Sequence, residues 1–529
     1  MLRIGSLALA GALAVQAAIA GDLASEAHRW WAHVAYLADD KLEGRNAGSP
    51  GHRKAAEYVA GEFQRLGLRP AGASGYLQPV RLESRRLIPE KSSLALVRNG
   101  ASETLKLGGD AIIGTRIAAS GKVAAPLVFV GYGLTVPENN HDDLKGLDLK
   151  GKVAVYLNGG PSSIPGALRA HYSSALERGK SLRAAGAVGA IAFSNPKHMD
   201  LPWERSALAS VLPSMGLTDP ALADPQGLKL SVSFNPSALD KLFAGSGHTA
   251  AEILALADAD RPLPRFPLPA SIRANVVVER LPVVSENVAG ILEGSDAKLK
   301  GEYVVLSAHL DHLGVGRPIG GDSVYNGAMD NASGIATLLE IAEHIRAAGK
   351  APKRSLLLVA VTAEEKGLLG SRYFAAHPGM DRKAMVANLN FDMFLPLFPL
   401  RTLTVFGLEE STLGDAVRLI AKAHEVAIQS DPEPERNRFI RSDQYSFIRS
   451  GVPALAFKVG YETGTAEEKI AKEWLSKRYH APSDDLRQPV DLPAAAAFNR
   501  MMAAITAAVA DGAERPSWKP ESFFRRFSE

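Results

Sequence analysis

The chain has 529 residues, too many for one hydrophobic core and enough for two to four domains. Its composition is that of a globular protein, and 60 basic against 57 acidic residues leave a net charge of +3, which gives no support to nucleic acid or a membrane surface as a partner. The absence of cysteine excludes disulfides, a lipid anchor on cysteine and thiolate ligands. Any metal site must therefore use histidine and carboxylates.

Residues 1–20 are predicted to be a secretory signal. Arg3 precedes an Ala- and Leu-rich stretch that ends in the small-x-small motif Ala18-Ile19-Ala20. The stretch is short and interrupted by glycine and polar residues, which argues against a transmembrane anchor. No later run is expected to span a bilayer. We therefore expect an exported protein, periplasmic or extracellular, without stable membrane insertion.

Residues 21–109 are expected to pack against the C-terminal half of the chain. Apolar residues at helical spacing predict a helix over 54–66, after a turn-rich loop that begins with Leu42-Glu43-Gly44-Arg45. Residues 110–262 have short strand-like runs among many Gly and Pro, which predicts a separate β-rich domain. Four prolines within 261–269 predict a linker without regular structure. In the β-rich part, strands are expected at 126–130, 152–157 and 188–193, and a helix at 174–185.

Strands and helices alternate over residues 271–515. Continuous apolar runs of strand length are typical of strands covered by helices on both faces. The sequence therefore predicts an α/β domain, a mostly parallel mixed sheet sandwiched by helices, with the β-rich unit inserted ahead of it. The expected strands are 303–307, 355–361 and 385–390, and the expected helices are 332–348, 367–377, 413–424 and 493–509.

Five patches in this half carry histidine or acidic side chains at the end of an apolar run or in a loop or Gly-rich turn. Open α/β sheets bind ligands beyond the carboxyl ends of their strands. A carboxylate there is costly unless it is paired or ligated, and cations relieve the repulsion between adjacent acids. Histidine and carboxylates without sulfur suit zinc, with manganese or cobalt possible. The residues are His309, Asp311, Asp330, Glu364, Glu365, Asp392 and His480.

Each patch alone also has a simpler interpretation, such as a helix N-cap, a solvated pair of acids or a chance histidine. Strand alternation would point His309 and Asp311 the same way, so that the Asp311 carboxylate could accept the second imidazole N–H. The same alternation would turn His312 away as a structural residue. Asp484 is a similar candidate acceptor near His480.

Together and in this order, the patches resemble metallopeptidase family 28, the dizinc aminopeptidases and their carboxypeptidase relatives. The β-rich unit, with Gly131-Tyr132-Gly133, resembles the protease-associated domain that is often inserted ahead of the catalytic half. By this resemblance, residues 271–515 would be the catalytic domain. The matching motifs are His-x-Asp, Asp-Asn-Ala-Ser-Gly, Glu-Glu-x-Gly-x-x-Gly-Ser, Asn-x-Asp-Met and Tyr-His-x-Pro-x-Asp.

The resemblance implies two zinc ions per chain that share one carboxylate. The implied ligands are His309, Asp330 and Asp392 for one ion, and Asp330, Glu365 and His480 for the other. Glu364 would be the general base, Asp311 would orient His309, and Tyr479 would stabilise the oxyanion. The sequence departs from the family pattern at Gln444, where histidine is frequent, and at Ala481, where threonine is common.

The implied activity is that of an exported aminopeptidase acting on peptides. Three alternatives stay open: a carboxypeptidase of the same family, a one-zinc acyl transferase similar to glutaminyl cyclases, and a binding module of this fold that has lost its metals. The basic residues Arg436, Arg438 and Arg441 could bind a substrate carboxylate or form a solvated surface. The sequence makes no prediction of terminal-residue preference or oligomeric state.

Overall fold

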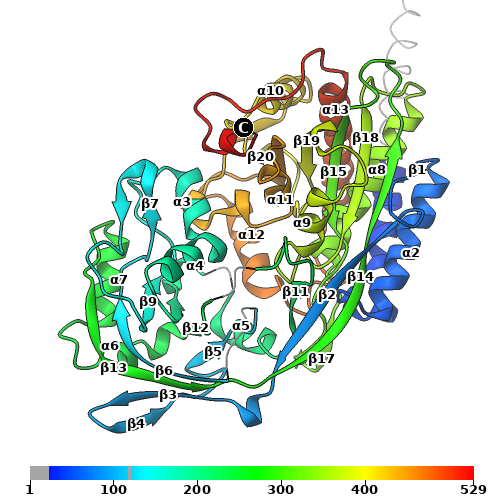
Figure 1. The fold of residues 1–529 in the computed structure, drawn as a ribbon. Helices are drawn as coiled ribbons and strands as arrows, with labels where there is room; N and C mark the ends of the chain where they lie inside the picture. The colour runs from blue at the N-terminus through cyan, green and yellow to red at the C-terminus, as the bar shows by residue number, and fades with distance from the viewer. Residues whose placement is uncertain (1–22, 117–120, 200, 225–226, 529) are drawn as a thin grey trace, which may run out of the picture.

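The computed structural model describes residues 23–116, 121–199, 201–224 and 227–528. The predicted signal at 1–20 lies outside the described residues. Two sheets, each with its own helices, lie side by side and are joined by long strands (Figure 1). We call them the sandwich unit and the inserted unit.

The sandwich unit is built on a ten-stranded mixed sheet in the order β11-β2-β14-β18-β15-β19-β22-β20-β21, with β1 paired to β14. The predicted parallel centre is present, and the flanking strands β14, β2 and β20 are antiparallel. The central strands are β18 (Ser355–Val361), β15 (Tyr303–His309), β19 (Met385–Asn390) and β22 (Ala454–Val459). The others are β1 (Arg69–Pro70), β2 (Leu77–Leu87), β11 (Ser214–Leu217), β14 (Val278–Leu292), β20 (Thr402–Phe406) and β21 (Ala427–Gln429).

Helices cover both faces of this sheet, which explains the continuous apolar strands. In β15, Val304 and Leu306 belong to the core on one face, whereas Val305 belongs to the core on the other. Successive strand residues point to opposite faces, so the residues on both faces of the strand must be apolar. The first core includes the helix at 23–37, α2 (Pro50–Arg65), α8 (Ser333–Ala347), α10 (Leu413–Ala423), α12 (Ala466–Lys477) and α13 (Leu492–Asp511); the second includes α9 (Leu369–Ala376) and α11 (Gln444–Ile448).

Helix α13 corrects one expectation from the sequence. By length and composition it could cross a membrane, although no run after the signal was expected to qualify. Its Ala495, Phe498 and Met501 are fully buried in the core of the sandwich unit. Its apolar composition is accounted for by this packing, which the sequence did predict.

The inserted unit is an eight-stranded sheet in the order β4-β3-β13-β6-β9-β10-β12-β5, with a hydrophobic core of its own. Its strands are β3 (Ser93–Arg98), β4 (Ala101–Thr104), β5 (Ala111–Ile113), β6 (Lys122–Phe129), β9 (Val153–Leu157), β10 (Gly189–Phe193), β12 (Leu230–Phe234) and β13 (Phe266–Asn275). Its helices are α3 (Gly166–Ser173), α4 (Ala175–Ala184), α5 (Trp203–Ala209), α6 (Asp240–Phe243) and α7 (Ala250–Asp258). Two short hairpins complete the fold, β7 (Thr135–Val136) with β8 (His141–Asp142), and β16 (Gly314–Ile319) with β17 (Asp322–Tyr325).

The proline-rich linker predicted at 261–269 is wrong in its second half. Strand β13 begins at Phe266 and pairs with β6, with a register shift between Pro267 and Ser271. Such an irregularity lets a strand hold proline, which cannot donate to the ladder. The sheet thus runs from β3 to β13, and the predicted limits of 110 and 262 are too narrow.

Strands β2 and β14 pair along their whole shared length and carry the chain between the two units (Figure 1). The inserted segment also returns one strand, β11, to the edge of the large sheet beside β2. The two units are therefore held close together along one side.

Candidate metal centre

The acidic and histidine patches meet at the carboxyl edge of the central strands. His309 is the last residue of β15, Glu364 follows β18, and Asp392 follows β19. Asp330 lies in the turn η6 (Ala328–Ala332) before α8, and His480 follows α12. Parallel strands end at one edge of a sheet, so neighbouring strands bring these residues together.

The Asp330 carboxylate lies between two sets of ligand atoms. Its Oδ1 is 3.2 Å from His309 Nε2, which is 3.4 Å from Asp392 Oδ1. Its Oδ2 is 3.2 Å from His480 Nε2, which is 3.2 Å from Glu365 Oε2. One oxygen of Asp330 thus faces each set, as a bridging carboxylate requires.

These separations fit zinc. Ligands that bind a tetrahedral zinc at about 2.0 Å lie about 3.3 Å from one another. In addition, Asp330 Oδ2 and Asp392 Oδ1 are buried oxygens without a hydrogen-bond partner among the described residues. Buried carboxylate oxygens are costly unless paired or ligated. The residues present can therefore hold two ions that share Asp330.

The charge of the cluster also favours cations. Burial acts to lower the pKa of His480, yet the Glu365 and Asp330 carboxylates raise it to about 10. Burial likewise opposes protonation of His309, whose pKa is raised well above its usual value by Glu364, Asp330 and Asp392. The carboxylates thus favour positive charge on the two imidazoles. Metal ions would supply that charge instead, and their binding would release the imidazole protons.

A family comparison identifies this part of the chain. The family model described as "Peptidase family M28" matches residues 287–506, which contain every ligand atom of the two sets. Residues 287–506 are a peptidase family M28 domain.

Relatives of known name match parts of this chain. It is 32% identical to carboxypeptidase Q of Rattus norvegicus over 108 residues, 20% of this chain and 21% of the relative. It is 30% identical to leupeptin-inactivating enzyme 1 of Streptomyces exfoliatus over 176 residues, 31% of this chain and 38% of the relative. The chain thus spans about a fifth to two fifths of these curated relatives.

A solved structure shares the fold over nearly the whole chain. It is an aminopeptidase from Aneurinibacillus sp. strain AM-1, with a TM-score of 0.56 and 20% sequence identity. The similarity covers 94% of this chain and 96% of that chain. It therefore includes the inserted unit as well as the M28 domain.

Glu364 lies beside the two ligand sets without belonging to either. Its carboxylate makes no hydrogen bond or ion pair with the residues that the structure describes, and it lines the cavity above the site. Burial raises its pKa well above the usual value, with contributions from Asp443 and Asp392 against His309. A carboxyl group held in this way is suited to taking up and returning a proton.

The predicted role of Asp311 is wrong in detail. His309 Nδ1 contacts the backbone carbonyl of Asp311 at 3.0 Å, not its carboxylate. The carboxylate instead accepts the N–H groups of Glu364 at 3.0 Å and Glu365 at 3.4 Å. Strand β15 ends at His309, so strand alternation no longer governs where Asp311 points. Asp311 therefore positions the loop of the two glutamates.

His312 was predicted to turn away from the site, which is also wrong. Its Nδ1 is 2.8 Å from Glu365 Oε1, and the side chain is fully buried. His312, Asp330 and Glu365 form a possible metal-binding group. His480 is 3.2 Å from both carboxylates, whereas His312 is 3.9 Å from Asp330, so His480 fits the second ligand set better. His312 holds the other oxygen of Glu365.

Asp443 is a neighbour of the site that sequence reasoning missed, although its patch was noticed. Both its carboxylate oxygens are buried without a hydrogen-bond partner among the described residues. Burial raises the pKa of Asp443 to about 7. Beside it, Gln444 accepts from Asn390 Nδ2 at 2.8 Å and donates to the carbonyl of Phe439 at 2.9 Å. Gln444, at the position where histidine is frequent in the family, thus links the last residue of β19 to the backbone of Phe439.

The Asp330 turn is held from behind by Asp484. Its two carboxylate oxygens accept the N–H groups of Met329 at 2.9 Å and Asp330 at 3.0 Å. Asp484 was predicted to support His480, but its carboxylate instead accepts from the backbone of Met329 and Asp330. The last motif of the M28 domain therefore supplies both the candidate ligand His480 and the support of Asp330, the candidate shared ligand.

Arg45 anchors the loop that begins at Leu42 to segments beside the site. Its guanidinium is buried, and it donates to the carbonyls of Leu310 at 2.9 Å, Asn326 at 2.7 Å and Gly327 at 3.0 Å, and to that of Leu37. Two of the chain segments that carry site residues are thus tied to the N-terminal segment. Burial lowers the pKa of Arg45 only to about 10, which leaves it charged behind the carboxylates.

Replacing Arg45 with methionine is expected to lower the free energy of unfolding by about 3 kcal/mol or more, because several buried carbonyls lose their donor. Urea unfolding of the metal-free protein measures this loss. The exposed Arg69 provides a matched control, R69M, that should change little. A loss below about 1 kcal/mol for R45M would show that water replaces the guanidinium.

Tyr479 lies next to His480, with ring centroids 4.0 Å apart, and it lines the cavity. Its backbone carbonyl accepts from Arg205 Nη1 at 2.5 Å, and Arg205 also donates to the carbonyls of Leu475 and Ser476. Arg205 comes from α5 of the inserted unit. The inserted unit therefore caps the end of α12 and fixes the turn that carries His480.

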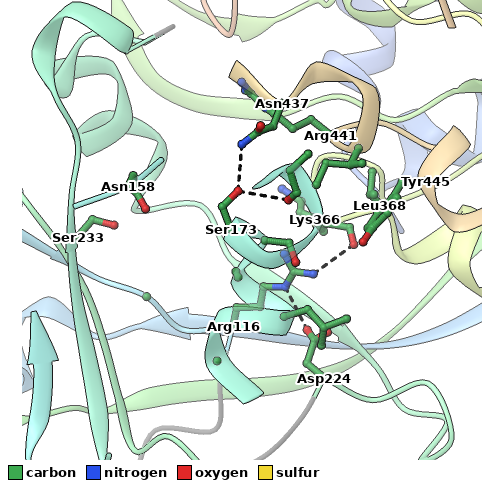
Figure 2. Close-up of a pocket in the computed structure, with 18 of the residues that line it drawn as sticks. Arg116, Asn158, Ser173, Asp224, Ser233, Lys366, Leu368, Asn437, Arg441 and Tyr445 are labelled. Carbon is green, nitrogen blue, oxygen red and sulfur yellow. Dashed lines mark hydrogen bonds and ion pairs between the residues drawn. The ribbon is translucent and has the colours of Figure 1, made fainter. Parts of the chain in front are cut away.

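A cavity of about 1660 Å³ opens between the two units above the M28 site. Glu364, Glu365 and Tyr479 are among the residues that line it. Arg116, Asn158 and Ser173 of the inserted unit also lie in its wall (Figure 2). Contacts between the units, such as Asn437 Nδ2 to Ser173 Oγ at 3.0 Å, lie in its wall. The cavity is therefore in direct contact with the candidate metal centre.

Proposed function

We propose that this protein is an exported, zinc-dependent exopeptidase that removes N-terminal residues from peptides. The observation that carries the proposal is the Asp330 carboxylate, which offers one oxygen to each of two His–carboxylate sets beside the unligated Glu364. Two-metal sites with a shared carboxylate and an adjacent carboxyl group suit metal-assisted hydrolysis.

His309, Asp330 and Asp392 would hold one zinc, and Asp330, Glu365 and His480 the other; manganese or cobalt would also suit these ligands. When bound, the ions supply an activated water and Lewis-acid stabilisation of the scissile carbonyl. Everything else in the reaction falls to side chains of the chain itself.

Glu364 would take the proton from the attacking water and pass it to the nitrogen of the leaving amine. Its position supports this, because Asp311 fixes the backbone of Glu364 while its carboxyl group faces the cavity. The Tyr479 hydroxyl would donate to the oxyanion that forms at the carbonyl carbon. Burial raises the pKa of Tyr479 well above 10, aided by Asp330, so its proton is retained for that purpose.

The choice of aminopeptidase rests on resemblance. The solved structure that shares the fold over 94% of the chain is named an aminopeptidase. A carboxypeptidase is the second candidate, because carboxypeptidase Q matches part of the chain and the cavity is rich in arginine and lysine.

Export rests on residues 1–20, and N-terminal sequencing of the exported protein should begin at Gly21.

Metal analysis and a substrate panel test the proposal. The chain from residue 21 should contain about two zinc ions, and it should release amino acids from aminoacyl chromogenic substrates until a chelator removes the metal. Two zincs with release only from N-blocked peptides would favour the carboxypeptidase. Two zincs with conversion of N-terminal glutamine would favour cyclase chemistry. No metal bound or taken up would leave a binding module and refute the ligand assignments.

A further inference from the structure

Lys366 is a buried cation that the proposed reaction does not use. Its side chain lines the cavity directly after Glu364 and Glu365, yet the residue is only 7% exposed. Among the residues that the structure describes, none forms a hydrogen bond or ion pair with it. A buried ammonium group is costly unless a partner compensates it. Lys366 therefore feels the Glu365 and Asp311 carboxylates without a direct contact to either, and it has no direct partner among the described residues at a position where a substrate could supply one.

Two arginines stand close to the Lys366 loop. Arg116 of the inserted unit donates from Nη2 to the carbonyl of Gly367 at 3.2 Å, and Arg372 comes from α9. Asp224 pairs with both, at 3.0 Å from Arg116 Nε and 2.9 Å from Arg372 Nη1. One carboxylate thus serves two guanidinium groups, and Arg372 Nε and Nη2 have no hydrogen-bond partner within the described part of the chain. Figure 2 shows Lys366, Arg116 and Asp224 in the same part of the wall.

Most of the other charged residues that line the cavity are also basic. Ten arginine and lysine residues line it against four acids, two of which, Glu364 and Glu365, belong to the metal centre. The chain as a whole is almost balanced, so basic residues are concentrated at this cavity. Three of them are paired with acids that do not line it, Lys180 and Arg449 with Glu177 and Arg436 with Glu433. A cleft lined by one sign of charge raises the local concentration of ligands of the opposite sign.

We infer that Lys366, flanked by Arg372 and Arg116, forms an anion subsite beside the metal centre that binds a carboxylate of the substrate. The inference rests on the proposed peptidase function and names its substrate class, short peptides with a carboxylate close to the scissile bond. That carboxylate is either the C-terminus of a dipeptide or an Asp or Glu side chain following the bond. Ammonium and guanidinium groups bind carboxylates through strong charge-assisted hydrogen bonds.

Matched substrates separate the two sources of the carboxylate. With the zinc-loaded full chain, Leu-Gly is compared with Leu-Gly-amide, and Leu-Glu-amide with Leu-Gln-amide. In at least one pair, kcat/KM should favour the acid by about 10-fold or more. Lys366→Met should bring that ratio close to one, whereas Lys366→Arg should keep most of it. The exposed Lys298 gives a control, K298M, that should preserve the wild-type ratio.

Two outcomes overturn the inference without touching the proposed function. One is hydrolysis of both members of each pair at equal kcat/KM, and the other is an acid preference that K366M retains. If no peptide is hydrolysed, the proposed function fails instead. Calorimetry with Leu-Glu and the metal-free protein then decides the subsite: binding weakened about 10-fold or more in K366M supports it, and no binding or equal binding refutes it.

Discussion

Replacing Glu364 with glutamine is expected to lower kcat by about 10²- to 10⁴-fold, the usual contribution of a general acid–base group, while zinc content stays at about two per chain. The amide has almost the same shape as the carboxyl group but can neither take up a proton from water nor return it to the leaving amine. Glu364 lies outside both ligand sets, so its charge is not needed to hold either ion. Steady-state kinetics and elemental analysis of one preparation measure both quantities.

Glutamine at the exposed Glu473 is the matched control, because the same chemical change on the outer surface of α12 should leave kcat and zinc content unaltered. Loss of zinc in E364Q would show that Glu364 is a ligand. Near-native kcat with full zinc would assign the proton transfer to another group, and Asp443, the buried carboxyl group nearby, would be the next to test.

The fold of the M28 domain was largely predictable because its strands are buried on both faces. Residues 356–361, for example, are apolar at every position, and the predicted limits match β18 and β15 within two residues. Ligand types follow from the same pattern, since His309 and Asp392 come directly at or after strand ends. A polar residue at the end of an apolar strand is a local signal that needs no knowledge of the tertiary structure.

The errors arose where a local rule was extended past its physical range. Alternation holds only while a strand continues, so it failed for Asp311 and His312, which follow the last residue of β15. Proline excludes a regular hydrogen-bond ladder but not an irregular one. The prediction of a linker at 261–269 therefore failed at Pro267 and Pro269, which lie in β13.

Other features could not be predicted because they depend on contacts between distant segments. Arg205 caps α12 from a helix of the inserted unit about 270 residues earlier in the chain. Arg116 and Arg372 share Asp224 across the cavity, and only the folded structure shows that Lys366 faces the same space. The sequence could thus indicate the metal chemistry, but the shape and charge of the substrate path come from how the two units meet.

Asparagine at Asp330 is expected to remove both ions and lower kcat/KM by at least about 10³-fold. The neutral amide cannot offer an anionic oxygen to each ligand set, whereas the carboxylate oxygens lie 3.2 Å from His309 and 3.2 Å from His480. Asparagine at Asp392 provides the contrast, because it weakens only the set with His309 and should leave about one zinc per chain. Elemental analysis after dialysis measures this directly, with asparagine at the exposed Asp415 as the control that should keep two.

The difference between the two ligand variants is the critical result: if D330N and D392N lose the same amount of zinc, Asp330 does not bridge two ions. If D330N keeps both, His312 or another group must complete the second set, and the shared-carboxylate arrangement is refuted.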